Sequence, residues 1–267
     1  MKLAFSTLGC PDWTFNEIVS TAIDLGFDGI EIRGIEKEVF APYAKPFLGA
    51  NIDKTISLLN QKNVKISLLA TGVVLGENRN AAISESTAYI DLAVKLGVPF
   101  IRLMISSHPF PEKSDFNLAV SAYREICNYA KGKNVIPLVE TNGILAESKV
   151  MAEFMEETAC ENSGVLWDIH HPYRYFNESI DETVNNIGKY VKYVHVKDSV
   201  MNGDKVIYKL MGQGDIPVIP ALKALKAFGY NSYITLEWVK RWCPELEEAG
   251  IVFSHFSNYY KTKFSNL

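Results

Sequence analysis

The chain has 267 residues, of which 48% are hydrophobic, and its formal net charge is −4. This length and apolar content suffice for a sizeable core in one large domain or two small ones. The slightly acidic charge gives no general attraction for nucleic acids or anionic membranes, and no apolar run approaches the roughly 20 residues of a membrane span.

In chain order, short apolar runs alternate with segments whose apolar residues recur at helical spacing. We expect strands at residues 2–9, 29–34, 64–72, 99–106, 135–143, 164–171, 191–198 and 233–240. We expect helices at residues 15–25, 50–63, 79–96, 116–131, 147–158, 180–189 and 217–228, and a last helix from Pro244 onward. Thr14 or Asn16 is the expected cap of the first helix, and Gly26 and Gly97 are expected helix stops.

This alternation predicts the fold class. Near-continuous apolar strands alternating with helices favour a parallel sheet whose outer face is covered by helices. Eight such units in about 250 residues favour a closed (β/α)8 TIM barrel over an open sheet. Because no linker or low-complexity tract interrupts the pattern, we expect a single α/β domain over residues 1–267.

The connection after the strand at 191–198 is unusually long. It contains Asn202-Gly203 between β-prone flanks, which predicts a hairpin with a type I′ turn. Loops that follow barrel strands form the active-site face, so the hairpin either covers a substrate or is a surface hairpin without a role. Asp215 is expected to cap the next helix, with Pro217 near its start.

Polar side chains end four consecutive strands. The fifth strand ends in Glu140, the sixth in Asp168 with His171 shortly after, the seventh in His195 and the eighth in Glu237. Each residue alone has an ordinary explanation, such as a hydrogen-bonded core histidine. In a barrel these ends meet at one mouth, where three carboxylates and a histidine would repel each other without a cation. The pattern therefore predicts a divalent metal site.

The ligand types indicate the metal and the chemistry. An oxygen-rich set with one imidazole suits Mn²⁺ first, with Mg²⁺, Co²⁺ and Zn²⁺ as alternatives. A metal that binds two adjacent oxygens of a hydroxy-ketone lowers the pKa of the C–H between them, and a carboxylate can take that proton. Glu140 and Glu237 come from strands separated by two others. They could approach a substrate from different sides, as epimerisation or aldose–ketose isomerisation through an enediolate requires.

Six motifs carry a family resemblance: GFDGIEIR, LVETNG, WDIHH, YVHVKDS, GQGDIP and YITLEW. In this order they resemble the signatures of the xylose-isomerase-like TIM-barrel superfamily. That superfamily holds sugar and sugar-phosphate isomerases and epimerases, inosose dehydratases and apurinic-site endonucleases. The resemblance implies that Glu140, Asp168, His195 and Glu237 bind the metal, and that Glu140 and Glu237 are also the catalytic acid–base pair. It further implies that His171 contacts the substrate.

The resemblance leaves the roles of other positions open. Glu31 matches a glutamate near the end of the second strand, with a substrate-binding or a structural role. Lys240, next to Arg241, is a substrate-binding candidate that could bind a phosphate or be solvated. Met201 stands six residues after His195, where the sugar 3-epimerases carry an arginine, which puts their known substrates in doubt.

The resemblance favours a metal-dependent isomerase or epimerase acting on a sugar, keto-sugar or polyol. The alternative is a lyase on the same site, an inosose-type dehydratase or keto-sugar eliminase, because expulsion of a β-leaving group begins with the same proton removal. An apurinic-site endonuclease is less favoured. The positions of its Asp-x-His ligands hold Val206 and Tyr208, and its third-strand histidine is absent from LLATGVV.

Location and partners follow from the remaining features. The apolar residues at the N-terminus are interrupted by Ser6, Thr7 and Gly9, which a secretory signal peptide would not allow. The four cysteines lie far apart and none has C-x-x-C spacing, so we expect reduced thiols in a cytoplasmic protein. We expect a small-molecule sugar or polyol as substrate and no nucleic acid or membrane partner. The sequence leaves a homo-oligomer open.

Overall fold

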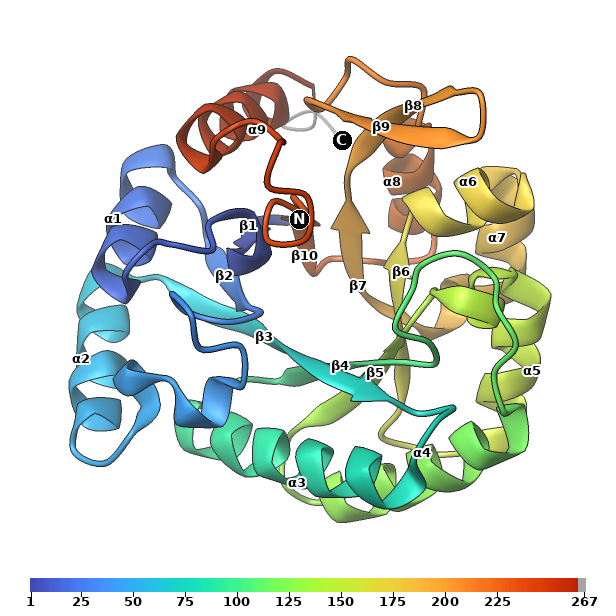
Figure 1. Ribbon diagram of the computed structural model, residues 1–267, viewed down its shortest axis with the longest axis horizontal. Coiled ribbons are helices and arrows are strands. Elements are labelled where there is room, and N and C mark those ends of the chain that lie inside the picture. The colour runs from blue at the N-terminus through green and yellow to red at the C-terminus, as the bar shows by residue number, and fades with distance from the viewer. Residues whose placement is uncertain (264–267) are drawn as a thin grey trace. The chain divides into compact units, whose positions relative to one another are not determined.

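The computed structural model describes residues 1–263. Eight parallel strands form a closed barrel in the order β1-β10-β7-β6-β5-β4-β3-β2, while β8 and β9 form a separate two-stranded sheet (Figure 1). The predicted (β/α)8 barrel is therefore confirmed. The strands are β1 (Lys2–Ser6), β2 (Gly29–Ile32), β3 (Lys65–Val74), β4 (Phe100–Met104), β5 (Ile136–Glu140), β6 (Gly164–Asp168), β7 (Val191–Val196), β8 (Asp198–Asn202), β9 (Lys205–Lys209) and β10 (Tyr233–Leu236).

Helices follow the barrel strands along the chain. The α-helices are α1 (Phe15–Leu25), α2 (Asn51–Lys62), α3 (Arg79–Leu96), α4 (Phe116–Ala130), α5 (Ser148–Thr158), α6 (His170–Phe176), α7 (Ile180–Ile187), α8 (Val218–Ala227) and α9 (Ala249–Lys263). Short 3-10 helices are η1 (Thr7–Gly9), η2 (Ala41–Tyr43), η3 (Lys45–Phe47), η4 (Gly143–Ala146) and η5 (Gly188–Tyr190). The order of strands and helices agrees with the pattern predicted from the sequence.

The chain divides into two compact units. The first unit comprises residues 1–67 and 195–267, and the second comprises residues 68–194. Each unit thus contains barrel strands together with the helices that cover them. The prediction of one domain over residues 1–267 stays a prediction.

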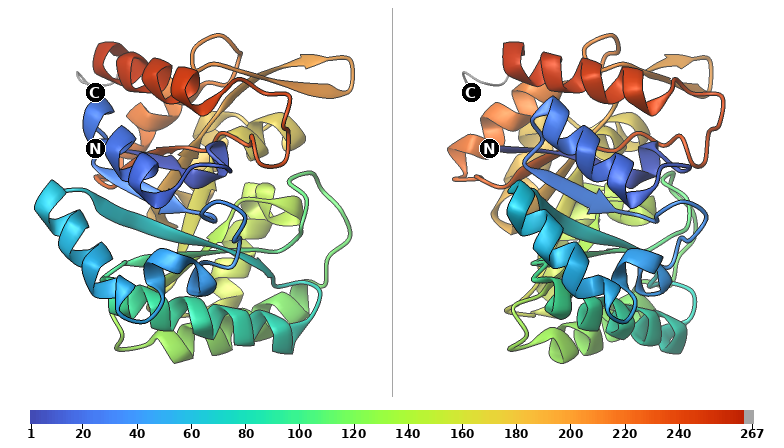
Figure 2. Two further views of the ribbon diagram at one scale, coloured as in Figure 1. Left: turned by 60° about the vertical axis from the view of Figure 1, so that its left-hand side comes forward. Right: turned by 90° about the vertical axis from the view of Figure 1, so that its left-hand side faces the viewer.

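In the first unit, β1 is the central strand. It pairs in parallel with β2 and β10, so that Phe5 lies opposite Ile30 on one side and Leu236 on the other. Helix α9 lies beside α1 (Figures 1 and 2). The buried ring of Phe5 contacts those of Phe27 and Phe253, with ring centroids 4.9 and 4.3 Å away. These aromatic contacts fix α9, and the turn between α1 and β2, against the strand.

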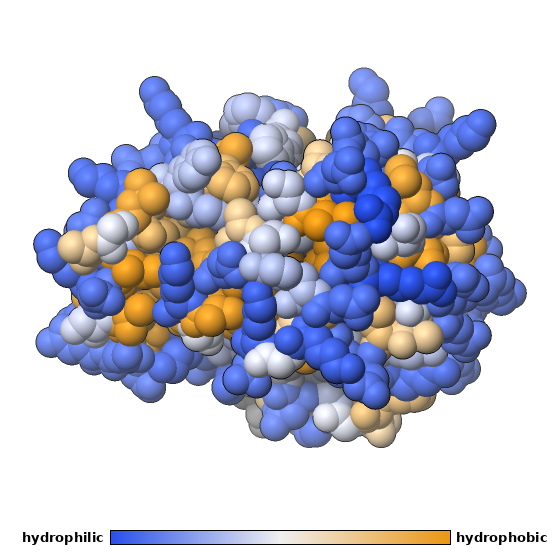
Figure 3. Space-filling view, turned by 90° about the horizontal axis from the view of Figure 1, so that it is seen from below, coloured by the Kyte–Doolittle hydropathy of each residue, from blue (hydrophilic) through white to orange (hydrophobic). Residues whose placement is uncertain are grey.

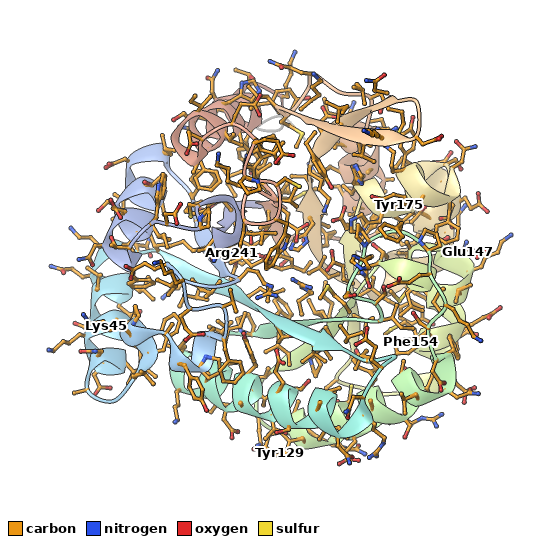
Figure 4. All side chains as sticks on the ribbon, viewed as in Figure 1. Lys45, Tyr129, Glu147, Phe154, Tyr175 and Arg241 are labelled. Carbon is orange, nitrogen blue, oxygen red and sulfur yellow. The ribbon has the colours of Figure 1, made fainter. Side chains whose placement is uncertain are left out.

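In the second unit, β4 pairs in parallel with β3 and β5, and β5 pairs with β6. The helices on the outside of these strands pack through aromatic residues. Phe154 of α5, labelled in Figure 4, is fully buried, and its ring centroid lies 5.7 Å from Phe116 and 5.5 Å from Tyr123 of α4. Tyr123 also donates a hydrogen bond to the carbonyl of Pro137 in β5, which ties α4 to the strand.

Helix ends follow the predicted chemistry. Thr14 caps α1 in a reciprocal capping box with Glu17. Gly26 and Gly97 end α1 and α3 in the left-handed conformation, with φ of 76° and 68°. Both expected glycine stops and one of the two alternative caps are therefore confirmed.

Three local predictions are wrong at the ends of elements. His170 and His171 do not continue strand β6 but begin helix α6, which places both rings on the first turn of a helix. Asp215 is not the cap of α8: Pro217 occupies that position, and the backbone N–H of Asp215 donates to Ser199. The last helix begins at Ala249 rather than at Pro244, and residues 264–267 lie outside the described part of the chain.

The predicted hairpin is confirmed, but its turn is of another type. Asn202 pairs with Lys205 in the β8–β9 ladder, so Gly203 and Asp204 form the two-residue tip. Gly203 has a φ of 59°, whereas Asp204 is not among the residues with positive φ. A type I′ turn needs positive φ at both central positions.

The surface mixes hydrophobic and hydrophilic side chains. On the face seen in Figure 3, groups of hydrophobic side chains lie among hydrophilic ones. Partly exposed apolar residues include Ile23 of α1 and Val94 of α3. Such scattered exposure is normal on the water-facing side of helices. Within residues 1–263, every helix is too short or too polar to cross a membrane.

Candidate functional site

All predicted site residues except Lys240 lie in two groups of buried side chains, one in each unit. The β5–β6 group, in the second unit, contains Arg102, Glu140, Asp168, His170 and His171. The β7–β10 group, in the first unit, contains Glu31, His195, Lys197 and Glu237. Charged side chains are seldom buried unless they are paired or bind a metal, so each group requires an explanation.

In the β5–β6 group, the surroundings of His171 fix a proton on its Nδ1. Its Nδ1 lies 2.8 Å from the carbonyl oxygen of Thr141, which can only accept, so Nδ1 carries the proton and donates. In the neutral ring Nε2 then presents a lone pair, and it lies 3.4 Å from Oδ2 of Asp168. Two acceptors that face each other at this distance are unfavourable. A proton, a substrate hydroxyl or a metal cation near both atoms would remove the repulsion.

Asp168 is held at the end of β6 by backbone contacts. Its N–H donates to Thr141 Oγ1 at 2.9 Å, and its Oδ1 accepts from the N–H of His170 at 3.0 Å. Asp168, His170 and His171 each offer a ligand atom within 4.8 Å of the others, so this cluster could hold a metal ion. Tyr175, labelled in Figure 4, lies beside both histidines, with ring centroids 5.9 and 5.8 Å away.

Glu140 has a cationic neighbour that the sequence analysis did not identify. Arg102 of β4 places its Nε 3.4 Å from Glu140 Oε2, and both side chains are almost fully buried. The other carboxylate oxygen of Glu140 lies 3.9 Å from Nδ1 of His171. Arg102 Nε and Nη1 have no hydrogen-bond acceptor within residues 1–263. The signal was an arginine inside the apolar strand FIRLM, where a charged residue needs a partner.

In the β7–β10 group, His195 lies between two carboxylates. Its Nε2 is 2.7 Å from Glu31 Oε2, and its Nδ1 is 3.4 Å from Glu237 Oε1. If the neutral imidazole donates Nε2–H to Glu31, its Nδ1 presents a lone pair toward Glu237. A carboxylate behind a histidine in this way fixes the tautomer and orientation of a metal ligand. Glu31 is thus placed to orient His195.

Lys197 was also missed by the sequence analysis. It lies two residues after His195, and its ammonium group makes a buried ion pair with Oε2 of Glu237. The two oxygens of Glu237 therefore have different neighbours: Oε2 contacts the lysine, whereas Oε1 faces the histidine. A lysine at the end of the apolar run VKYVHV was the signal, because side chains two residues apart in a strand share a face.

Asp198 completes the strand-end motif, but its carboxylate is used by the backbone. It accepts hydrogen bonds from the N–H groups of Ser199, Gly212, Gly214 and Ile216, at 2.8 to 3.2 Å. A Cβ at Gly214 would lie 2.1 Å from Asp198 Oδ1, so the loop requires glycine there. These contacts fold the segment between the hairpin and α8 and occupy N–H groups that a bound phosphate would need.

Lys240 makes its hydrogen bonds with its own loop and not with the other predicted residues of the first unit. Its ammonium group donates to the carbonyl oxygens of Pro244 and Leu246 and to Glu248 Oε1, at 2.5 to 2.9 Å. It therefore holds its own loop together. The neighbouring Arg241, labelled in Figure 4, donates to carbonyl oxygens of the loops that follow β1 and β2.

A comparison with protein families identifies the chain. Residues 19–256 match the family described as xylose isomerase-like TIM barrel. The chain belongs to this family. An uncharacterized protein of Methanocaldococcus jannaschii is 32% identical over 96 residues, a match that spans 36% of this chain and only 31% of the archaeal protein.

Solved structures share the fold at low sequence identity. The IolI protein with a bound zinc atom has a TM-score of 0.81 at 18% identity, covering 99% of this chain and 100% of its own. The D-psicose 3-epimerase of Clostridium cellulolyticum, with D-tagatose, has a TM-score of 0.77 at 19% sequence identity, and the match covers 100% of this chain and 98% of the epimerase chain. The probable 3-DHS dehydratase AsbF of Bacillus anthracis has a TM-score of 0.77 at 16% sequence identity, and the match covers 98% of this chain and 99% of the AsbF chain.

Proposed function

We propose that the protein is a divalent-metal-dependent isomerase or epimerase that acts on a sugar, keto-sugar or polyol. The reaction would proceed through an enediolate, with carboxylates as acid and base. The observation that carries the proposal is the position of Glu140, Asp168, His195 and Glu237. They lie at or beside the carboxyl ends of β5, β6, β7 and β10, which are consecutive in the barrel order. Active sites of such barrels are built at these ends.

The donor chemistry of both groups fits a divalent ion. In each unit a histidine nitrogen and a carboxylate oxygen lie 3.4 Å apart, an arrangement that a nearby cation stabilises. Glu140, Asp168, His195 and Glu237 would hold the ion, with Mn²⁺ first and Mg²⁺, Co²⁺ or Zn²⁺ as alternatives. When bound, the metal would stabilise the negative charge that develops when a hydroxy-ketone loses the proton between its two oxygens.

Glu140 and Glu237 are the proposed proton carriers. One carboxylate would remove the proton from the substrate carbon, and the other would return a proton on the opposite face or at the neighbouring carbon. Arg102 and Lys197 compensate the charge of the buried carboxylates in the free protein. Each carboxylate can therefore remain buried and ionised, which is the form that accepts a proton.

Three other residues would assist. Because Nδ1 of His171 donates to the carbonyl oxygen of Thr141, Nε2 of the neutral ring can accept a hydrogen bond from a substrate hydroxyl. Glu31 would orient His195 through the contact at Nε2, and we retain it as a substrate-binding candidate. Lys240 also remains a substrate-binding candidate, although its ammonium group would have to bind the substrate in addition to, or instead of, its three loop oxygens.

A lyase is the second candidate function. The chain resembles the fold of a probable dehydratase as well as that of a 3-epimerase. Removal of the same proton by the same carboxylate gives a lyase if the enediolate expels a β-leaving group instead of taking up a proton. The two reactions differ in their products, since a lyase releases water or an aglycone and an isomerase conserves the mass of the substrate.

A solvent-exchange screen tests both functions. The full chain is incubated with Mn²⁺ in deuterated water and a series of keto-sugars, and the products are followed by NMR and mass spectrometry. We expect deuterium to enter one carbon-bound position of a substrate, with conserved heavy-atom composition for an isomerase. Loss of water or an aglycone would instead assign a lyase. Unchanged substrates across the whole series, with metal bound, would contradict an enzyme of this class.

Metal analysis tests the proposed ligands separately. We expect about one divalent ion per chain, and we expect His195→Ala to lower the metal affinity sharply because it removes a ligand. His108→Ala is the matched control, since His108 is exposed and stacks on Phe110. If His195→Ala kept full occupancy and activity, the ligand assignment would be wrong.

A further inference from the structure

Two of the four cysteines lie together in the second unit, outside the groups described above. Cys127 is near the end of α4 and is only 1% exposed, while Cys160 is partly exposed in the loop between α5 and β6. Their side chains lie close enough to interact electrostatically. The proposed function gives this pair no task, because Cys160 precedes the amino end of β6 and Asp168 lies at its carboxyl end.

The backbone holds the loop of Cys160 against α4. Ala159 adopts a left-handed conformation with a φ of 48°, which turns the chain directly after α5. The side chain of Asn162 then donates to the carbonyl oxygen of Cys127 at 3.0 Å, and that of Ser163 donates to the carbonyl of Cys160. The bond from Asn162 holds the loop that carries Cys160 against the part of α4 that carries Cys127.

A polar surface pocket of about 360 Å³ adjoins the partly exposed thiol. Its wall includes Cys160 and the charged residues Arg124, Lys131 and Glu161. Arg124 is anchored by Glu157, and Lys131 lies 3.9 Å from Glu161. Small polar molecules can thus reach Cys160 from solvent, whereas Cys127 lies behind it.

The surroundings favour the thiolate at Cys160. The neighbouring Cys127 side chain and the positive charge of Arg124 lower the pKa of Cys160 to about 7, although the Cys160 thiol also donates a hydrogen bond to the carbonyl oxygen of Thr158 at 3.4 Å. The neighbouring Cys160, together with burial, raises the pKa of Cys127, so the proton stays on the buried sulfur. Cys243 provides a contrast, because burial raises the pKa of its thiol. Reactive cysteines combine thiolate character with access to solvent, and both conditions meet at Cys160.

We propose that Cys160 is a peroxide-reactive thiol and that Cys127 is its resolving partner, so that a hydroperoxide converts the pair into an intramolecular disulfide. In the first step the Cys160 thiolate attacks the O–O bond of hydrogen peroxide. Cys160 becomes a sulfenic acid, and the hydroxide that leaves takes up a proton to give water. This step oxidises the sulfur by two electrons and reduces the peroxide by the same number.

In the second step the sulfur of Cys127 attacks the sulfenic sulfur of Cys160. The S–S bond forms, the S–O bond breaks, and the hydroxyl group of the sulfenic acid takes the proton of Cys127 and leaves as water. A thiol or thioredoxin-type dithiol would reverse the change by thiol–disulfide exchange. The buried position of Cys127 prevents direct attack by the oxidant, and its contact with Cys160 favours the disulfide over further oxidation of Cys160.

Peptide mapping of the reduced full-length protein tests the proposal. The protein is treated with a small excess of hydrogen peroxide, the remaining thiols are alkylated, and the digest is analysed without reduction. We expect one linked pair of peptides that carries Cys127 and Cys160, with Cys10 and Cys243 alkylated. Irreversibly oxidised Cys160 without a linked peptide, or a link to another cysteine, would overturn the assignment.

Two variants and one measurement on the unaltered protein separate the roles. Cys127→Ser should leave Cys160 as a sulfenic acid that dimedone traps, and Cys160→Ser should give no linked peptide. Without any substitution, alkylation by iodoacetamide should rise with pH around a midpoint of about 7 at Cys160 and only at clearly higher pH at Cys243, because burial raises the pKa of that thiol. Equal alkylation rates at these two thiols at pH 7 would contradict the proposal even if a variant failed to fold.

Discussion

Glu140 and Glu237 are the same residue type in different electrostatic surroundings. In the second unit, Glu140 lies 3.4 Å from the guanidinium of Arg102, an ion pair without a hydrogen bond at Nε. In the first unit, Glu237 forms a buried hydrogen-bonded ion pair with Lys197. A guanidinium is a planar, weakly hydrated cation with several donors, whereas an ammonium group is a compact point charge. Glu237 is therefore hydrogen-bonded to its cation, whereas Glu140 Oε2 and Arg102 Nε form an ion pair without a hydrogen bond.

This difference matters for a reaction that needs two proton carriers. In both units one carboxylate oxygen faces the cation and the other faces a histidine, His171 or His195. The arrangement lets each glutamate use one oxygen for its charge partner and one for the reaction. Within residues 1–263, Arg102 has buried N–H groups without an acceptor. A substrate oxygen could accept from them, because buried donors gain most from a partner.

The largest expected effect is on catalysis. Glu140→Gln and Glu237→Gln should each lower proton transfer by roughly 10²- to 10⁴-fold, because Gln cannot accept a proton at neutral pH. Some metal should remain, since Gln still offers one oxygen. The variant without the first base should stop exchanging the substrate proton with deuterated water, whereas the other could still exchange it while forming little product.

The comparison becomes sharper when the reaction starts from the other epimer, because the two roles should then reverse. Glu125→Gln, at an exposed position, is the matched control. If both site variants retained metal and reacted at the parental rate, neither glutamate would be the proton carrier. His171 would then be the first alternative base.

The next effect is on stability. Arg102→Met and Lys197→Met should each lower the free energy of unfolding by about 3–5 kcal/mol, because each leaves a buried carboxylate without its cation. Arg79→Met is the control: it removes an exposed pair with Glu125, which typically contributes about 0–1 kcal/mol. Urea denaturation of the metal-free proteins measures all three. Losses below 1 kcal/mol at Arg102 and Lys197 would mean that these ion pairs do not stabilise the buried glutamates.

Metal addition extends this test. A ligand that binds the folded state stabilises it by mass action. If Glu140 and Glu237 bind the proposed metal, Mn²⁺ supplies positive charge that either cation variant lacks. Mn²⁺ should then raise the stability of both variants more than that of Arg79→Met.

The barrel could be predicted because its signals are local. Apolar runs and glycine stops such as Gly26 and Gly97 lie within a few residues of the elements that they define. The candidate acid–base residues were also detectable, since a glutamate at the end of an apolar strand is unusual. The partners of these residues were not, because Arg102 and Glu140 come from different strands. The spacing of residues along the sequence does not indicate which charged side chains from different strands become neighbours.

The same limit explains the wrong local predictions. Asp215 precedes Pro217 as a cap should, but contacts from Asp198 to the backbone of Gly214 and Ile216 organise that loop instead. These contacts join residues 16 and 18 positions apart. The turn of the hairpin differed because the pairing register placed Gly203, rather than Asn202, at the first tip position.

A smaller effect is expected on metal affinity. Glu31→Gln should weaken metal binding about 10- to 100-fold, because the carboxylate that orients a histidine ligand is replaced by a neutral amide. The contact between Glu31 and His195 at 2.7 Å is the reason to expect this. Equilibrium dialysis with Mn²⁺ measures the affinity, with the exposed Glu245→Gln as control. An unchanged affinity would restrict Glu31 to a structural or substrate-binding role.

The smallest effect concerns the β8–β9 hairpin, which distinguishes the first unit from the second. Met201 and Ile207 on this hairpin are 42% and 37% exposed, so apolar surface is available to cover a substrate. Replacing residues 200–207 by a short turn would remove this surface. Half-burial of one such side chain contributes on the order of 1 kcal/mol, which predicts a loss of about fivefold in kcat/KM.

The contacts of Asp198 at the base of the hairpin allow an effect on substrate binding to be distinguished from an effect on folding. Asp198 binds Gly212 and Gly214 below the removed segment, so these contacts and the start of α8 should persist. The melting temperature should therefore stay within a few degrees of the parent, while the loss appears in KM rather than in metal occupancy. Unchanged kinetics on the true substrate would make the hairpin a surface element without a role in binding. A collapse in stability would instead show that the hairpin supports the fold, and the comparison between the two units would then rest on the glutamates alone.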